Sequence, residues 1–469
     1  MKIKRLLALL MALAMVAAAC GDSDDGEAGT GGDTTAATTG ETDETDEGDE
    51  GGDVAPEDIE TGAGVTEDAI RVGLMADLSG IFATLVVEIV DAHEAYFEMV
   101  NENGGVAGRM IEPVIEDAGY DVPRTIELYQ EFAQDNEEGV AMMSLSVGSP
   151  HTSAIAADLE ADSMVAIPLT WYSGWADPEF GAPVAEMYTT YCLESHNGLS
   201  YMHDKLQEEG KETRLAIISF PGEYGQDGAT GAKLAAEALG LEIVYDGEAQ
   251  VVPGADQTPV ISELVNAQPT LVWSTINPTA LAEIFGGARA QGLDALWSGN
   301  SPSFNHQLLG TAVGPDLSEF YTHSTYTALW GADVEGMDEL VSTMAESRPT
   351  AVVSDAYILG WTYAQLAHQL LEYAAERGDL TREGIMAAFQ DEGFTADFGG
   401  LAPGQTWAGD PNEYLVRESY MYDVDASAQN LVPVSEEGAS TGLILEEGPF
   451  TAQITGDFAW DGPCFAPQG

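Results

Sequence analysis

Basic residues are scarce in this sequence. The 469 residues include 15 lysines and arginines against 80 aspartates and glutamates, so the formal net charge is −65 at pH 7. Nucleic acids and anionic membrane surfaces would repel a chain of this charge, so neither is an expected partner. Beyond the amino terminus, the only lysines are Lys205, Lys211 and Lys233. An acidic excess of this size indicates a halophilic-like surface, adapted to high salt.

Sequence motifs of common enzyme classes are also missing. There is no Gly-x-Ser-x-Gly nucleophile elbow and no phosphate-binding loop that ends in Gly-Lys-Ser/Thr. His93-Glu94 does not extend to the His-Glu-x-x-His pattern of a zinc helix, and Gly222, Gly225 and Gly228 have the wrong spacing for a dinucleotide loop. We therefore expect no enzymatic activity, no cofactor and no metal ion.

The amino terminus has the pattern of an export signal. Three basic residues precede an apolar run over residues 6–19, which ends in Ala-Ala-Ala before Cys20. This ending resembles the lipobox at which bacterial lipoproteins are cleaved and acylated. We predict a lipoprotein signal peptide over residues 1–19 and lipidation of Cys20, which would anchor the protein to the outer, extracytoplasmic face of the cell membrane. An ordinary signal peptide with an unrelated cysteine is the alternative.

Residues 20–66 are predicted to form an acidic, disordered stalk. They contain many Gly, Thr, Asp and Glu residues and neither a basic nor an aromatic one. Such a segment cannot bury enough apolar surface to become ordered, and its charge of one sign keeps it extended.

Cysteine is rarer still than lysine. The chain has three, and once Cys20 is assigned to the lipid, Cys192 and Cys464 remain. In an exported protein two such cysteines pair more often than they stay free. We predict a Cys192–Cys464 disulfide that attaches the C-terminal tail, residues 451–469, to the body of the protein. Two free thiols are the alternative.

Strand and helix patterns alternate along the rest of the chain. Residues 69–119 show the unit: a short apolar strand, a small-residue loop, a helix with apolar residues at helical spacing, a glycine turn and a second strand. The same alternation continues in two blocks, before and after about residue 190. About 400 residues are too many for one compact domain. The pattern predicts an α/β protein with two doubly wound, Rossmann-like lobes.

Several segments resemble the type I periplasmic binding proteins, and most closely the branched-chain amino acid or amide-binding subunits of ABC transporters. The segments are IRVGLMADLSG with its helix and VNENGGVAGRMIEPVIEDAG, Tyr224-Gly225 after LAIISF, the strand–helix unit at 271–292, and the helices in 357–389. Together they extend over about residues 68–425. The resemblance implies two lobes joined by three crossings, near 189–192, near 321–325 and within 400–412, with a ligand held between the lobes as they close.

The lobe boundaries follow from the same resemblance. They place residues 68–190 and 324–402 in lobe one, and residues 191–323 and 403–450 in lobe two. The implied function is that of a monomeric, lipid-anchored binding protein that captures a small polar solute and delivers it to an ABC permease. A ligand-sensing module of the same fold that signals to a partner protein is the alternative.

Eight residues are predicted to contact the ligand. In the first lobe, Ser79, Ser149, Thr170 and Tyr172 belong to loops at the carboxyl ends of predicted strands, where open α/β sheets bind their ligands. The other four are Tyr224, Asn277, Asn300 and Tyr326. Of these, Tyr224 corresponds to an aromatic residue that closes over the ligand in the family, and Tyr326 lies on the second crossing.

Asn300 departs from the family pattern. Amino-acid binders of the family carry at this position a carboxylate that holds the ammonium group, whereas here the sequence has an amide with no neighbouring acid. An amide accepts a hydrogen bond but cannot neutralise a buried ammonium. The sequence therefore admits a branched-chain amino acid, but also an amide, a urea-like molecule or a carboxylate.

Overall fold

The computed structural model describes residues 55–177, 180 and 183–467. The predicted signal peptide, the lipidation at Cys20 and the greater part of the predicted stalk lie outside the described residues. Within them, no helix is both long and apolar enough to span a membrane.

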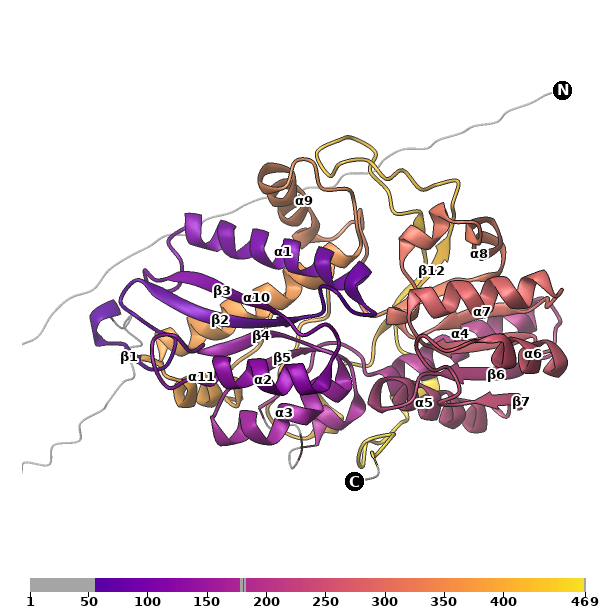
Figure 1. The fold of residues 1–469 in the computed structure, drawn as a ribbon, viewed down its shortest axis with the longest axis horizontal. Coiled ribbons are helices and arrows are strands. Elements are labelled where there is room, and N and C mark those ends of the chain that lie inside the picture. Colours follow the sequence, from indigo (N-terminus) through magenta and orange to yellow (C-terminus); the bar gives the residue numbers. More distant parts are fainter. Residues whose placement is uncertain (1–54, 178–179, 181–182, 468–469) are drawn as a thin grey trace, which may run out of the picture. The chain divides into compact units, whose positions relative to one another are not determined.

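The first lobe is built on a four-stranded parallel sheet with the order β3-β2-β4-β5 (Figure 1). Three of its strands are short and mostly apolar, which is typical of a sheet covered on both faces, whereas the edge strand β3 carries three acids and is partly exposed. The strands are β2 (Ala69–Ala76), β3 (Met110–Asp117), β4 (Met142–Val147) and β5 (Ala166–Leu169).

Helices cover both faces of this sheet. Helices α1 and α10 pack against each other on one face, and α2 and α3 pack together on the other (Figure 1). The helices of this lobe are α1 (Ala83–Glu102), α2 (Val122–Phe132), α3 (Ser149–Ala161), α9 (Glu335–Ser347), α10 (Ala356–Glu376) and α11 (Arg382–Phe389). Helix α11 begins after Thr381, whose hydroxyl accepts a hydrogen bond from the Gly384 amide as an N-cap.

The second lobe repeats the plan with the strand order β7-β6-β8-β9. Helices α4 and α5 pack together, as do α6 and α7. The strands are β6 (Arg214–Ser219), β7 (Glu242–Gly247), β8 (Leu271–Thr275) and β9 (Leu296–Gly299). The helices are α4 (Tyr191–Glu208), α5 (Glu223–Leu239), α6 (Thr258–Ala267), α7 (Pro278–Ala290) and α8 (Gly314–Phe320).

A third, antiparallel sheet with the order β10-β12-β13 extends from the second lobe. The backbone of Tyr321, just before β10, bridges Trp297 of β9. The strands are β10 (Thr322–Thr325), β12 (Ser419–Val424) and β13 (Leu443–Phe450). The shorter elements are η1 (Pro56–Asp58), η2 (Ser173–Ala176), η3 (Ser301–Ser303), η4 (His306–Gly310), α12 (Pro411–Tyr414), α13 (Gln453–Gly456), β1 (Glu60–Thr61) and β11 (Asp379–Leu380).

The chain passes between the lobes three times, and the three crossings contact one another. Gln405 of the third crossing accepts a hydrogen bond from the Tyr188 amide (3.1 Å) and donates one to the Glu186 carbonyl (2.8 Å), both on the first. The ring of Tyr188 stacks on Tyr326 of the second crossing, with centroids 5.3 Å apart. This arrangement confirms the expected fold of two doubly wound lobes with three crossings.

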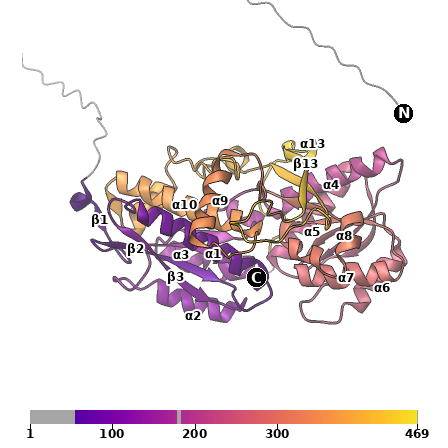
Figure 2. The ribbon, with the colours of Figure 1, turned by 90° about the horizontal axis from the view of Figure 1, so that it is seen from above.

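Two segments differ from the expectation. Residues 55–66 were assigned to the stalk, but β1 pairs with β11, and Ile59 and Val65 are buried in the core of the first lobe. Helix α9, which the sequence analysis does not foresee, packs on α1 (Figure 2). Its apolar residues Met337, Leu340, Val341 and Met344 follow the i, i+3, i+4, i+7 spacing of an amphipathic helix, a signal that the prediction missed.

Candidate functional site

A cavity lies between the two lobes, at the carboxyl ends of their strands. It contains about 860 Å³ of space not filled by atoms, its open mouth included. The walls are mostly apolar, and no lysine or arginine is among the described residues that line them. The aromatic lining residues are Phe82, Tyr120, Trp171, Tyr191, Tyr224, Phe304 and Tyr326, and the aliphatic ones include Leu85, Val86, Ile89, Leu329, Leu359 and Leu443.

Three hydroxyl groups meet at one end of the cavity, and we call Ser149, Thr170 and Tyr191 the hydroxyl cluster. Ser149 begins α3 directly after β4, and Thr170 follows β5, the neighbouring strand. Their side chains are hydrogen bonded to each other, and the Tyr191 hydroxyl is hydrogen bonded to both. Burial raises the pKa of Tyr191 above its usual value, so its hydroxyl stays protonated at neutral pH.

The first turn of α3 adds backbone donors to the hydroxyl cluster. No side chain caps this helix, because its N-cap is Gly148. The glycine is required here: its φ is +96°, and an added Cβ would lie 2.6 Å from the His151 ring and 2.9 Å from Tyr120. The first amides of a helix have no partner within the helix, and the helix dipole favours negative charge there. Pro150 has no amide hydrogen, so Ser149 and His151 supply the donors among the first three residues. This end of the cavity therefore suits an anionic or hydrogen-bond-accepting group.

The aromatic walls of the cavity are packed closely. Tyr224 donates its hydroxyl to the Ile276 carbonyl at 2.6 Å, so only its ring is offered to a ligand. That ring packs against Tyr191 and Phe82, with centroids 4.8 and 6.0 Å apart. Tyr326 packs on Trp171 at 4.4 Å. Rings from both lobes and from the second crossing thus enclose one apolar space.

The lining also contains a second polar group, which we call the distal cluster: His306, His323 and Asp355. The Nδ1 atom of His306 lies 3.8 Å from an Asp355 oxygen, and the buried Nδ1 atom of His323 has no hydrogen-bond partner. Burial raises the pKa of Asp355 to about 6 and lowers those of His306 and His323 to about 4 and about 3. At pH 7 the distal cluster therefore has one carboxylate and two neutral imidazoles.

The cavity brings together some of the residues predicted from the sequence. Ser149, Tyr224 and Tyr326 line it, and Thr170 is hydrogen bonded to Ser149. The prediction did not include Tyr191, although it is the aromatic residue directly after the N-cap Thr190 of α4, at the first crossing.

The other four predicted residues do not line the cavity. Ser79 is exposed, and its hydroxyl is hydrogen bonded to Asp117. The hydroxyl of Tyr172 is donated to the Phe465 carbonyl of the C-terminal tail at 2.7 Å. Asn277 caps α7 and joins the lobes, because its amide donates to the Ile81 carbonyl at 3.1 Å.

Asn300 is fully buried behind the cavity and, contrary to the sequence analysis, it does have an acid beside it. Its amide donates to Glu194 of α4 at 2.9 Å and to the Tyr191 carbonyl at 2.8 Å. The same carboxyl accepts hydrogen bonds from the Ser301 amide and the Ser324 hydroxyl. Glu194 and Asn300 are 106 positions apart in the sequence, so the residues next to Asn300 in the sequence do not reveal this pair. The carboxyl of Glu194 does not line the cavity.

Glu194 makes the stability of the protein depend on pH. Burial raises its pKa from 4.5 to about 8, so between these values the native state holds a proton that the unfolded chain has lost. The free energy of unfolding then falls with rising pH, by about 1.4 kcal/mol per pH unit for one such group. We expect Glu194→Gln to flatten the decline by about this amount in urea unfolding between pH 5.5 and 7.5. Glu237→Gln, at an exposed position of α5, should leave the slope unchanged. Equal slopes in all three proteins would contradict the assignment.

The two parallel sheets, the three crossings and the enclosed cavity define a class of protein: a two-lobed binding protein that holds a small molecule between its lobes. The family model described as "Periplasmic binding protein" matches residues 69–429. This chain belongs to the periplasmic binding protein family, which consists of substrate-binding proteins and not of enzymes. The search of curated protein sequences finds no significant match.

Solved structures agree with this assignment. A fatty acid ABC transporter substrate-binding protein from Thermomonospora curvata is 27% identical in sequence, with a TM-score of 0.75 over 86% of this chain and 97% of that one. A branched chain amino acid ABC transporter from Thermus thermophilus with bound valine is 18% identical, with a TM-score of 0.67 over 83% and 98% of the two chains. An ABC transporter substrate-binding protein from Aeropyrum pernix is 18% identical, with a TM-score of 0.66 over 84% and 100%. The last two show likeness of fold alone.

Proposed function

We propose that this protein binds an aliphatic carboxylate between its lobes and delivers it to an ABC permease. The observation that carries the proposal is the cavity itself. It has hydrogen-bond donors at one end, no lysine or arginine among its described lining residues, and a long apolar wall beside the donors. The similarity to the fatty acid ABC transporter substrate-binding protein of Thermomonospora curvata supports the same ligand class.

The hydroxyl cluster favours a carboxylate head. A carboxylate accepts several hydrogen bonds, and here the hydroxyls, once they turn from one another to the ligand, and the first amides of α3 would donate them. A helix N-terminus stabilises an anion without a basic side chain, which fits a lining that lacks lysine and arginine. The charge of the head would be balanced by dipoles that are already in place, so it needs no counter-ion from the protein.

The walls favour an aliphatic body. Leu85, Val86 and Ile89 of α1 lie on one element, and Leu329, Leu359 and Leu443 come from three other segments. Burying a methylene group in such surroundings contributes about 0.8 kcal/mol. A ligand with an unbranched alkyl chain long enough to contact several of these residues would gain more binding free energy than a short polar molecule.

A branched-chain amino acid is the second candidate, and Asp355 is the observation that favours it. Asn300 and Glu194 do not line the cavity, but the carboxylate of Asp355 does, and it could hold an ammonium group. An amide or urea-like ligand would use the same hydroxyl groups without needing the charge of Asp355.

We also propose that the protein acts outside the cytoplasm as a monomer, tethered by lipidated Cys20 and the acidic stalk. Its family membership and the export pattern of residues 1–19 support this location. A signalling partner in place of a permease remains the alternative role. Genes for a permease and an ATPase beside this one would favour transport, and a sensor-kinase gene would favour signalling.

A thermal-shift series tests the ligand class. We expect hexanoate, octanoate and decanoate to raise the melting temperature, because ligand binding stabilises the folded state by RT ln(1 + [L]/Kd). Octanamide, which has the same chain without the charge, should bind at least about tenfold more weakly. If leucine and valine stabilise the protein and the alkyl carboxylates do not, the ligand is an amino acid. If none of these compounds shifts the melting temperature, the proposed site is wrong.

Leu359 tests whether the aliphatic body lies in the cavity. Its side chain is half-buried and lines the wall. We expect Leu359→Trp to abolish octanoate binding by filling the space, and Leu359→Ala to weaken it about fivefold, through lost apolar contact worth about 1 kcal/mol. Calorimetric titration measures both, with thermal unfolding of each variant as the control for folding. Unchanged affinity for Leu359→Trp would place the ligand elsewhere.

A further inference from the structure

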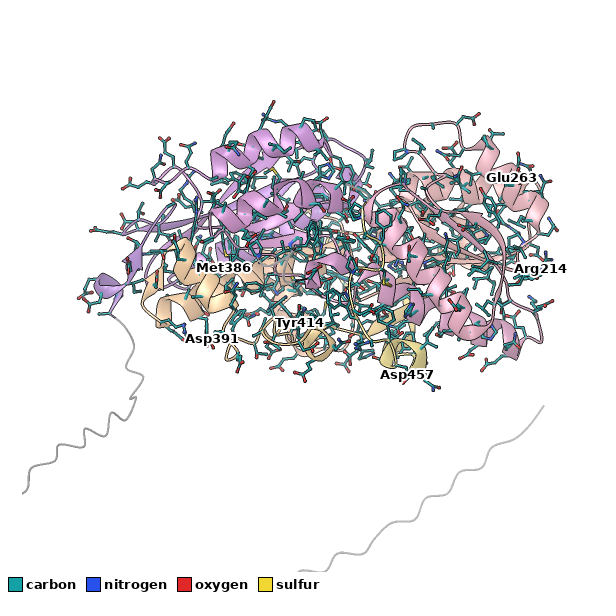
Figure 3. The ribbon with its side chains drawn as sticks, turned by 90° about the horizontal axis from the view of Figure 1, so that it is seen from below. Arg214, Glu263, Met386, Asp391, Tyr414 and Asp457 are labelled. Carbon is teal, nitrogen blue, oxygen red and sulfur yellow. A yellow bond between two sulfur atoms is a disulfide. The ribbon has the colours of Figure 1, made fainter. Side chains whose placement is uncertain are left out.

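A second cavity lies beside the first and third crossings, and it shares no lining residue with the one between the lobes. It contains about 840 Å³ of space not filled by atoms, its open mouth included. Four aromatic residues line it, Trp175, Phe389, Trp407 and Tyr414, together with the acids Glu186 and Glu392. In Figure 3, Tyr414 lies on the same side of the molecule as Asp391, which follows the end of α11.

The carboxyl group of Glu186 is buried in this cavity without a full set of partners. The residue is 3% exposed, and its Oε1 atom has no hydrogen-bond partner. Its backbone is held firmly, since its carbonyl accepts hydrogen bonds from the Gln405 amide at 2.8 Å and the Trp407 indole at 2.5 Å. A buried polar atom without a partner costs free energy, which a ligand with complementary chemistry would recover.

The aromatic rings are held in place around this carboxyl group. Trp407 packs between Phe389 and Phe394, each with its ring centroid 5.8 Å away. Trp175 is 3% exposed, and its indole Nε1 atom is a second buried atom without a partner. Trp407 and Tyr414 are half-buried, so part of each ring remains accessible to a ligand, and the Trp175 indole adds an unpartnered donor to the wall.

Charge in this cavity has one sign. Two carboxyl groups and no lysine or arginine are among the described lining residues. Asp410, just before α12, adds negative charge near Tyr414. Asp227 of α5 acts on Glu186, although burial raises its own pKa to about 7. Aromatic faces and carboxylates together attract organic cations, and a quaternary ammonium is well suited because it is easily desolvated.

We propose that this second cavity binds an organic ammonium ion, with the cationic head against Trp407 and Tyr414 and its charge balanced by Glu186. A hydroxyl group on the same ligand accepts the hydrogen bond of the Trp175 indole. The site is independent of the ligand between the lobes. Its lining includes Trp407 and Tyr414 of the third crossing, so its occupant contacts a segment that must move when the lobes close.

Proton release gives the proposal a specific signature. Burial and the neighbouring Asp227 raise the pKa of Glu186 well above its usual value, so the empty cavity favours its protonated form. A cation would bind the ionised form, so binding at pH 7 should release a proton into the buffer. The other titratable groups near Glu186 are Tyr363, Tyr414, the lining Glu392, Asp410, and Asp227, whose own pKa burial raises to about 7.

Calorimetric titration of the full protein with choline and with tetramethylammonium, at constant ionic strength, tests the proposal. We expect both to bind, and the binding enthalpy of choline to differ between phosphate and Tris buffers at pH 7 because a proton is released. Glu186→Gln should weaken the binding of choline at least about tenfold and abolish the dependence of its binding enthalpy on the buffer. Trp175→Phe should weaken choline more than tetramethylammonium, which has no hydroxyl group.

Two controls separate this site from the cavity between the lobes. Glu392→Gln, at an exposed rim position, should weaken choline less than Glu186→Gln does. Ser149→Asp, in the other cavity, should leave choline binding unchanged. The proposal is overturned if neither cation binds at tens of millimolar, or if Glu186→Gln folds normally, as judged by its melting curve, and binds choline as the wild type does.

Discussion

Replacing Ser149 by aspartate should weaken the binding of octanoate at least about a hundredfold. Ser149 is the first residue of α3, is almost fully buried, and is hydrogen bonded to Thr170 at the end of the cavity where we place the ligand's carboxylate. An aspartate there would occupy the hydroxyl cluster with its own carboxylate and repel that of the ligand. In a cavity that excludes water, like charges a few ångströms apart cost several kcal/mol.

Ser149→Ala is the matched control for this substitution. It removes one donor and adds no charge, so the loss should be about tenfold, in line with a hydrogen bond to a charged group. Calorimetric titration with octanoate and octanamide separates the two effects, because the neutral amide is not repelled by the new carboxylate. If Ser149→Asp binds octanoate as well as Ser149→Ala does, the head of the ligand is not at the hydroxyl cluster.

Removing the Cys192–Cys464 disulfide should lower the free energy of unfolding by about 2–5 kcal/mol. The bond joins residues 272 positions apart, from α4 to the C-terminal tail, and so constrains a long stretch of the unfolded chain. Once this link is cut, the tail is held by weaker contacts. The Cys464 amide donates to the Ser173 hydroxyl at 2.8 Å, and the Phe465 carbonyl accepts a hydrogen bond from Tyr172.

Urea unfolding of Cys464→Ser, with and without a reducing agent, measures this effect. Wild-type protein in the reducing agent should behave like the variant, and the variant should not respond to the reducing agent. Because Ser173 and Tyr172 belong to the first lobe and Cys192 to the second, we also expect the variant to bind octanoate less tightly. A change in stability below about 0.5 kcal/mol would show that the non-covalent contacts of the tail are sufficient.

The fold could be predicted because its signals are local. Short apolar strands, such as β2, and helices with caps, such as Thr381 before α11, can be recognised within a few residues of sequence. The segments that were predicted wrongly are those whose local sequence signals are weak or misleading. Helix α9 carries a single stripe of four apolar residues in a short, acidic segment. Residues 55–66 look like the acidic segment before them until β11 and the core of the first lobe give them partners.

The site could be predicted only where it follows strand ends. Ser149 and Tyr224 begin helices directly after strands or their turns, and both line the cavity. The partner of Asn300 could not be predicted, because Glu194 belongs to another helix and meets it only in the folded protein. The distal cluster is equally non-local: His323 comes from β10, whereas Asp355 precedes α10.

Titration of the wild-type protein with octanoate and with leucine, followed by calorimetry, tests the central claim most directly. The claim is that the cavity between the lobes selects an aliphatic carboxylate through its hydroxyl cluster and apolar wall. We expect octanoate to bind one to one, with a Kd in the micromolar range or tighter and a negative heat-capacity change from the buried chain. Leucine should give no saturable heat at the same concentrations. Tight binding of leucine with no binding of octanoate would contradict the account.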